Sequence, residues 1–174
     1  MKSCIVYLMV LVKYRTIPRE GFPIKNIEAA YIAGFFDGDG SVRLQLQPRE
    51  NSKLGFRIRT IISFAQKTDH ASELSWIRKV LGIGYIYARN DNMTELKIEG
   101  FDQVERILKV LEPYVLFKKR QVQLVLRALE VIKHKKGDIL TIAKISDEIS
   151  KINYVTITKK YTAKAVEKFL SEKT

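Results

Sequence analysis

Four segments of the chain alternate apolar and polar residues with the period of two that is typical of strands with one buried face. They are residues 41–47, 56–65, 84–89 and 93–99. In the first, Val42, Leu44 and Leu46 face one way and the intervening polar residues face the other. Short polar connectors that carry turn-forming residues join the members of each pair, so the pattern predicts two hairpins.

Segments with helical spacing of apolar residues surround these hairpins. They are residues 27–37, 70–81, 102–111, 118–134, 138–152 and 162–171. Asn26 is the expected N-cap of the first helix, and Thr68 or Asp69 that of the second. The order is therefore α-β-β-α-β-β-α with a helical tail. Four amphipathic strands with helices on one side indicate an α+β domain whose second sheet face is open.

These patterns divide the chain into three parts. Residues 1–26 form an N-terminal extension whose end, 16–23, has the prolines and glycine of a linker. Residues 27–174 form a single domain, with a core to about 134 and a helical tail from 135. The apolar run 4–12 is too short to span a membrane and lacks a cleavage site, so we expect an extra strand or packing arm and an intracellular, non-secreted protein.

The charge of the chain favours an anionic partner. With 174 residues, 31 Lys and Arg, and 19 Asp and Glu, the net charge is +12. A surplus of this size attracts nucleic acid or an anionic membrane, although a basic protein without such a partner is the alternative. One cysteine and two histidines exclude a disulfide framework and argue against a Cys- or His-based metal site within one chain.

The open face of the predicted sheet carries side chains of the types that hydrogen-bond to base edges. The candidate DNA-reading residues are Arg43, Gln45, Gln47, Arg57, Arg59, Ser63, Tyr87, Arg89 and Lys97. The alternative is an ordinary solvated sheet face. In the tail, Lys159, Lys160 and Lys164 are expected to contact phosphates, which adds affinity without sequence information. Trp76 and Phe64 are expected in the core.

The sequence Ile-Ala-Gly-Phe-Phe-Asp-Gly-Asp-Gly at residues 32–40 combines two unusual features. Ala30, Ala33, Gly34 and Asp37 follow one side of the helix, and such a smooth strip lets a second helix approach closely. Asp37 and Asp39 lie at the helix C-terminus, where the helix dipole disfavours carboxylates. A Mg²⁺ ion would compensate. An ordinary Asp-Gly turn is the alternative, whereas an EF-hand loop is excluded by the residues at its required ligand positions.

This nonapeptide resembles the motif of the LAGLIDADG homing endonucleases, with Ile32 in place of the first leucine. Four later blocks, SVRLQLQP, SFAQKT, LGIGYI and EPYVLFKKRQ, also resemble the single-motif, homodimeric members of that family. The resemblance is clear over 27–127 and looser in the tail. It implies the αββαββα fold of that family with a four-stranded antiparallel, saddle-shaped sheet. It also implies an intron-encoded, site-specific enzyme that cleaves both strands of a long pseudo-palindromic DNA site.

The resemblance also implies roles for individual residues. Asp39 binds the catalytic Mg²⁺, with the backbone carbonyl of Gly38 close by; Mn²⁺ or Ca²⁺ are also able to occupy such a site. Gln66 positions a water molecule, Lys118 is the active-site lysine, and Asp37 stabilises the helix end and the dimer interface. Because each chain has one motif and two strands must be cut, a symmetric homodimer is expected.

Residues 118–120 support the site independently, since three cations at the start of a helix are disfavoured by its dipole unless a phosphate lies nearby. A solvated charge run is the alternative. Two other functions stay open for a chain of this kind. One is an RNA-splicing maturase that binds intron RNA, and the other is a sequence-specific DNA-binding protein that does not cleave.

Overall fold

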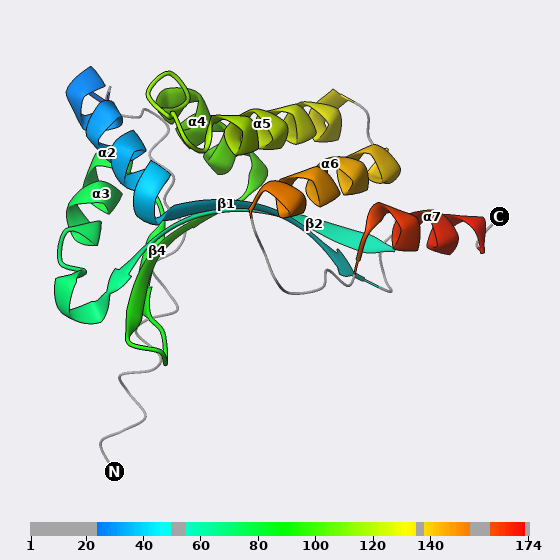
Figure 1. Cartoon of the computed structure of the whole chain (residues 1–174), viewed down its shortest axis with the longest axis horizontal. Helices are drawn as coiled ribbons and strands as arrows, with labels where there is room; N and C mark the ends of the chain where they lie inside the picture. Colours follow the sequence, from blue (N-terminus) through cyan, green and yellow to red (C-terminus); the bar gives the residue numbers. More distant parts are fainter. Residues whose placement is uncertain (1–23, 50–54, 135–137, 154–160, 173–174) are drawn as a thin grey trace, which may run out of the picture.

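The computed structural model describes residues 24–49, 55–134, 138–153 and 161–172 (Figure 1). The helices are α2 (Asn26–Asp39), the 3₁₀ turn η1 (Thr68–His70), α3 (Leu74–Leu81), α4 (Phe101–Leu111), α5 (Lys119–His134), α6 (Ile139–Ile152) and α7 (Ala163–Ser171). The strands are β1 (Gly40–Pro48), β2 (Phe56–Lys67), β3 (Tyr85–Ala88) and β4 (Met93–Glu99). This is the predicted α+β order with its helical tail. Most of the predicted extension, together with Lys159 and Lys160, lies outside the described residues.

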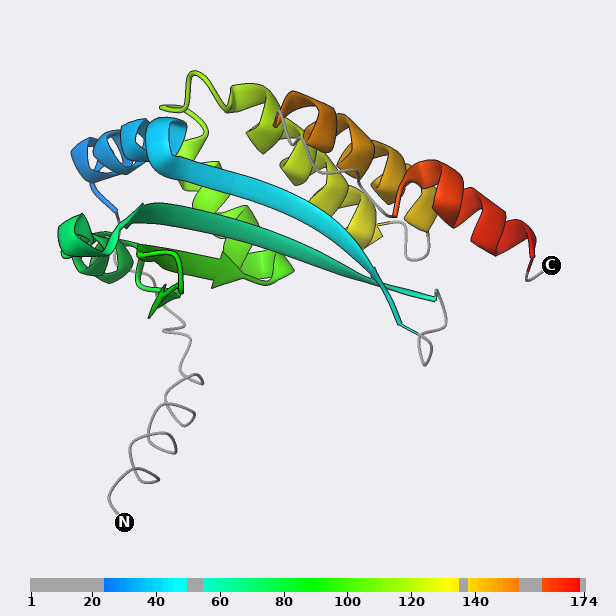
Figure 2. The ribbon, with the colours of Figure 1, turned by 60° about the horizontal axis from the view of Figure 1, so that its bottom comes forward.

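The four strands form one antiparallel sheet in the order β1-β2-β4-β3. The two long strands pair along their whole described length, from Gly40 opposite Phe64 to Pro48 opposite Phe56. Figure 2 shows that β1 and β2 curve together as one long bent ribbon, while β3 and β4 form a short hairpin beside one end. The sheet thus has the curvature of a saddle, with its helix-free face on the concave side (Figures 1 and 2).

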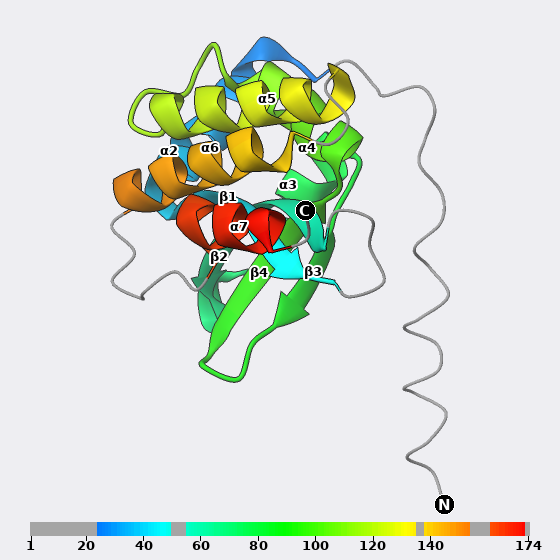
Figure 3. The same cartoon turned by 90° about the vertical axis from the view of Figure 1, so that its right-hand side faces the viewer.

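Helices cover one face of this sheet, as the alternating pattern predicts. Helices α4, α5 and α6 stack on the same side (Figures 1 and 3), and the apolar residues of β1 point into their core, with Val42 only 2% exposed. Phe64 of β2 is fully buried, which confirms its expected core position, and it contacts the rings of Phe35 and Phe36. None of the helices in the described segments lies on the opposite face, so the described part of the chain leaves it open (Figures 1 and 3).

A second, smaller core supports the far end of the long hairpin. Its buried members are Leu46, Phe56, Ile139, Ala143 and Val166. The tail helices α6 and α7 supply three of these residues, and the ring of Phe169 packs edge-on against Phe56. The tail therefore holds the tip of the β1–β2 hairpin in place. The nine residues of β1 separate this tip from the helix that carries the acidic motif.

Two predicted helix starts are wrong. Asn26 is the first residue of α2 and not its N-cap, because the chain is already capped one residue earlier, where Glu28 accepts a hydrogen bond from the Lys25 backbone at 3.1 Å. The predicted helix 70–81 begins at Leu74, since Thr68–His70 forms a separate 3₁₀ turn. No described helix is long and apolar enough to cross a membrane.

Candidate active site and DNA interface

The acidic motif lies where α2 runs directly into β1. Asp39 is the last residue of α2, and Gly40 begins the strand. A Cβ atom on Gly40 would lie 2.4 Å from the Phe36 ring and 2.6 Å from the Phe36 carbonyl oxygen, so only glycine fits this tight junction. The junction leaves the Asp39 side chain exposed at the end of the helix.

Gln66 reaches the same place from the end of β2. Its Nε2 donates a hydrogen bond to Asp39 Oδ2 at 3.3 Å, while its Oε1 accepts one from the Lys67 backbone at 2.9 Å. Residues 27 positions apart in the chain are thus brought together, as the resemblance implied. The bond to Lys67 fixes the orientation of the amide, so its NH₂ group faces the carboxylate.

Lys118 completes this cluster by binding the helix end. Its Nζ donates to the backbone carbonyls of Asp37 and, at 3.2 Å, Gly38. The Asp37 carboxylate in turn accepts hydrogen bonds from the backbone N–H groups of Leu116 at 2.7 Å and Lys118 at 2.9 Å. The unfavourable carboxylates at the end of α2 are therefore partly compensated within the chain, by an ammonium group and two N–H groups.

The described residues bring few candidate metal ligands together at the end of α2. No group of three or more His, Cys, Asp or Glu side chains with a metal-binding arrangement occurs among the described residues. Asp39 offers one exposed carboxylate, and the Gly38 carbonyl keeps a lone pair beside its bond to Lys118. These oxygen donors suit a hard divalent cation, whose remaining ligands would be water, a substrate phosphate or a carboxylate of a second chain.

Acidic side chains organise the open face of the sheet. Arg59 forms an ion pair with Glu99 at 2.6 Å, and Lys97 reaches the same carboxylate at 3.2 Å. Arg89 binds Glu95 at 2.6 Å. The strand alternation of 93–99 predicts that Glu95 and Glu99 point away from the core, toward solvent, but Glu95 is only 5% exposed. Its position opposite Tyr87 in the β3–β4 register was the signal that could have identified it.

The pKa values around Glu95 follow from these bonds. The hydrogen bond to Glu95, aided by burial, raises the pKa of Tyr87 to about 12. Burial alone would raise the pKa of Glu95, but the hydrogen bonds from Tyr87 and Arg89 outweigh it, and the pKa lies below its ordinary value. The Tyr87–Glu95–Arg89 network is therefore intact throughout the neutral range.

Replacing Glu95 with glutamine should lower the free energy of unfolding at pH 7 by more than it lowers it at pH 3. A carboxyl whose pKa is depressed in the folded state stabilises the protein above its unfolded-state pKa, about 4.3, and this stabilisation disappears as the pH falls through the folded-state value. Urea unfolding at both pH values measures the difference. Glu130→Gln, on the exposed side of α5, is the matched control. An equal loss at both pH values would contradict the ionic role.

The other predicted readers differ in exposure. Gln45, Gln47 and Arg57 lie along the β1–β2 ribbon, where Gln45 is opposite Arg59 and Gln47 is opposite Arg57. Ser63 is only 3% exposed, and its hydroxyl accepts a hydrogen bond from Arg43 Nη2 at 3.1 Å. We therefore reassign Ser63 from direct contact to positioning the Arg43 side chain. On α7, Lys164 is exposed.

Comparison with known proteins identifies the family to which this architecture belongs. The sequence model of the LAGLIDADG endonuclease family matches residues 32–128, from the acidic motif to the middle of α5. The chain belongs to the LAGLIDADG endonuclease family. It is 31% identical over 126 residues to DNA endonuclease I-CvuI of Chlorella vulgaris, covering 71% of this chain and 78% of that protein.

Further relatives agree with this family assignment. DNA endonuclease I-CreI of Chlamydomonas reinhardtii is 28% identical over 148 residues, 82% of this chain and 90% of that protein. The crystal structure of I-CvuI in complex with its target in the presence of calcium superposes with a TM-score of 0.76, 29% identity and coverage of 84% of this chain and 94% of that one. The structural similarity and the sequence motif therefore indicate the same family.

The helix of the LAGLIDADG motif exposes a different strip from the one predicted. Ala33 is fully buried in the core of its own chain, so its expected place in a dimer interface is wrong. Asp37 is half-buried and bonded within the chain. Ala30 and Gly34 are exposed as expected. The exposed strip, which we call the α2 surface, consists of Ile27, Ala30, Tyr31, Gly34 and Gly38. The helical period of 3.6 residues per turn is compatible with either strip, and the packing of α2 on the core determines which one is exposed.

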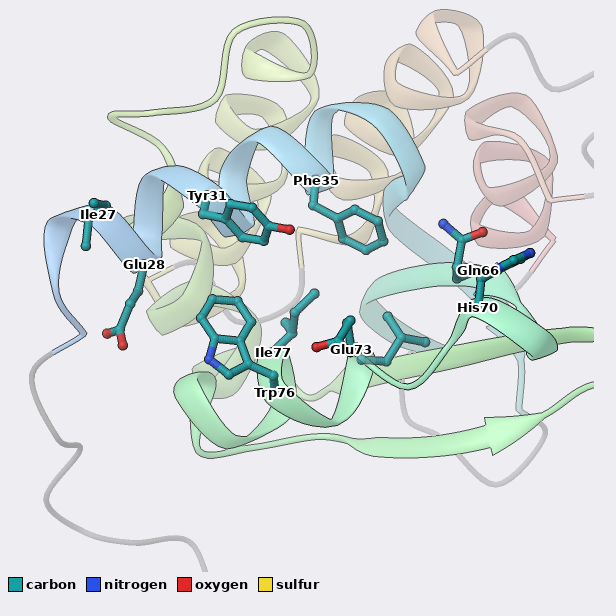
Figure 4. A pocket seen from close by; sticks show the side chains of 10 residues that line it. Ile27, Glu28, Tyr31, Phe35, Gln66, His70, Glu73, Trp76 and Ile77 are labelled. Atoms are coloured by element: carbon teal, nitrogen blue, oxygen red, sulfur yellow. The ribbon is translucent and has the colours of Figure 1, made fainter.

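Beside the α2 surface lies an apolar groove between α2 and α3 (Figure 4). The cavity has a volume of about 570 Å³. Trp76 was expected in the core, but it is 36% exposed and lies at the rim of this groove, with its ring edge-on to Tyr31. Gln66, which is hydrogen-bonded to Asp39, and His70 line the groove at one end (Figure 4). We call this feature, which sequence reasoning missed, the α2–α3 groove.

Proposed function

We propose that this chain is an intron-encoded, site-specific DNA homing endonuclease that acts as a homodimer. The observation that carries the proposal is the convergence of Asp39, Gln66 and Lys118 at the end of α2, beside an open and basic sheet face. The names of the two relatives, both DNA endonucleases, support the activity. The complex of I-CvuI with its target supports DNA as the substrate.

In this proposal the catalytic cation is Mg²⁺, held by the Asp39 carboxylates of both subunits with the Gly38 carbonyl close by. Bound divalent cations supply an activated water and neutralise charge at the leaving 3′-oxygen. The structures of I-CvuI with Ca²⁺ or Mg²⁺ are consistent with a divalent cation. Mn²⁺ is a further candidate.

Two side chains assist the reaction directly in this scheme. Gln66 has an amide fixed by Lys67, and its NH₂ group can orient a water molecule beside the Asp39 carboxylate. The Lys118 ammonium has three donors and uses two of them on backbone carbonyls. The third is free to hydrogen-bond a phosphate oxygen, and the positive charge stabilises the negative charge that develops there.

The sheet face would read the DNA in the major groove. Arginine and glutamine side chains suit guanine and adenine edges. Arg57, Gln45 and Gln47 are on the open face, and Arg43 and Arg57 are the candidate arginines without a described ion pair. Arg59, Arg89 and Lys97 are held by Glu99, Glu95 or Asp91, so their positions are set before DNA arrives. Lys159, Lys160 and Lys164 in the tail would add phosphate contacts.

Changing Gly34 to leucine should dissociate the homodimer. Gly34 is exposed at the centre of the α2 surface, and no atom lies within 4 Å of the position of an added Cβ. The variant therefore has room to fold as a monomer, while the larger side chain separates the two α2 helices. Sedimentation equilibrium measures the dissociation constant of the dimer. Gln123→Leu, at an exposed position of α5, is the control that adds a leucine outside the α2 surface. An unchanged dimer would show that α2 is not the interface.

Cleavage of a plasmid that carries the intron-free host gene junction tests the activity. We expect a double-strand cut at one position with Mg²⁺ and none with EDTA. Specific binding of the same plasmid without any cut would contradict the nuclease proposal and indicate a DNA-binding protein that does not cleave.

A further inference from the structure

The geometry points to a second contact between the two copies of this chain. In it, Leu116 and Phe117 of each subunit insert into the α2–α3 groove of its partner. This inference rests on the proposed homodimer and specifies where, besides α2, the two subunits hold each other.

The inserting element is the 116–117 loop, just before α5. The side chains of Leu116 and Phe117 are 75% and 85% exposed. Large apolar side chains at this exposure are unfavourable in water unless a partner covers them. The loop is not free to turn them inward, because Asp37 binds the backbone N–H groups of Leu116 and Lys118 on either side. Both side chains are thus presented outward at a fixed position beside the end of α2.

The receiving element is the α2–α3 groove, which is lined by apolar and aromatic side chains. The described residues include three further large exposed apolar side chains, Ile27, Tyr31 and Trp76, and all three line this groove. The exposed large apolar surface of the described chain therefore consists of one groove and one projecting loop. Two such surfaces on the same molecule are self-complementary, as a twofold interface requires.

Twofold symmetry brings these two elements together. Successive residues of a helix are about 100° apart around its axis. Gly34 and Gly38 therefore mark the middle of the α2 surface, with Phe35 on the flank that borders the groove and Asp37 on the opposite flank, where the 116–117 loop is attached. When two parallel helices are related by an axis running between them, each flank faces the opposite flank of its partner. The groove of one subunit consequently faces the 116–117 loop of the other.

The charges around the two elements are also complementary. Glu28 and Glu73 line the groove, whereas Phe117 is followed by the cations of Lys119 and Arg120. Arg120 is 70% exposed despite its ion pair with Glu148. A partner loop in the groove would bring these cations close to its acidic rim, which favours this occupant.

Changing Phe117 to glutamate should raise the dissociation constant of the dimer at least about tenfold. The apolar contact is lost in both symmetry-related grooves, and each new carboxylate lies beside the acidic rim of the groove. Sedimentation velocity over a dilution series gives the dissociation constant. Gln123→Glu, exposed on the next turn of α5, adds the same charge outside the contact and should change nothing. Adding Glu73→Lys to the Phe117→Glu protein should restore much of the affinity, and this rescue distinguishes a contact from misfolding.

Trp76 provides a second readout, since it is the only tryptophan of the chain. Its emission should shift to shorter wavelength as the wild-type dimer forms on concentration, and Phe117→Glu should abolish the shift. If Gly34→Leu dissociates the dimer while Phe117→Glu leaves its dissociation constant unchanged, α2 is the interface and the groove contact is wrong. A shift that is independent of concentration and lost on deletion of residues 1–23 would mean that the chain fills its own groove. A wild-type monomer, free and on DNA, would overturn the homodimer and this contact together.

Discussion

Asp39→Asn should reduce double-strand cleavage by more than about 10³-fold and leave DNA affinity within a few-fold. The substitution removes the one exposed carboxylate of the site while conserving its shape and its hydrogen bond to Gln66. It touches none of the sheet-face residues, so the DNA contact area is conserved. Cleavage under single-turnover conditions and a gel-shift titration with Ca²⁺ measure the two quantities separately.

The matched control for this variant is Asp69→Asn. Asp69 lies on the exposed 3₁₀ turn after β2, so this variant makes the same chemical change close to, but outside, the cluster. Cleavage by this control should be within a few-fold of wild type. Normal cleavage by Asp39→Asn would show that the carboxylate at the end of α2 is not the metal ligand.

Asp37→Asn should cost about 2 kcal/mol in the free energy of unfolding and reduce cleavage about 100-fold. The Asp37 carboxylate binds two backbone N–H groups of the 116–118 segment, one with each oxygen. An asparagine offers only one acceptor oxygen, so one N–H group would lose its partner. Because that segment holds Lys118 at the site, a loss of stability should be accompanied by a loss of rate.

Chemical denaturation and single-turnover cleavage test this variant, with Asp69→Asn again as the control. The dimer dissociation constant has to be measured alongside, since Asp37 lies beside the α2 surface. A fall in cleavage with unchanged stability would mean that Asp37 acts on the reaction itself. Unchanged values of both would contradict its role in holding the 116–118 segment.

The sequence predicts the sheet better than it predicts the helix surfaces. Strand alternation has only two phases, so the burial of Val42 and the exposure of Arg57 follow directly from the pattern. The face of α2 that packs on the core depends on the position of β2 and α4, which no local pattern encodes. For this reason Ala33 was placed on the wrong side, and Tyr31 was overlooked as part of the exposed surface.

Long-range pairing explains the remaining differences. Glu95 is buried because Tyr87 and Arg89 lie across from it in the folded hairpin, and a Glu in a strand pattern is ordinarily solvated. Trp76 was assigned to the core on residue type alone, but its side chain lies at a groove rim against Tyr31. The proximity of Asp39 and Gln66 could be predicted, because the resemblance to the family assigns both residues to one active site.

The stoichiometry of cutting tests most directly the claim that two copies of this chain form one cleavage site. A supercoiled plasmid with one target site is titrated with protein under single-turnover conditions with Mg²⁺, at DNA concentrations well above the dissociation constant. We expect conversion to linear DNA to be complete at two chains per site, without accumulation of nicked circles. Completion at one chain per site, or nicked circles as the end product, would contradict the shared cleavage site.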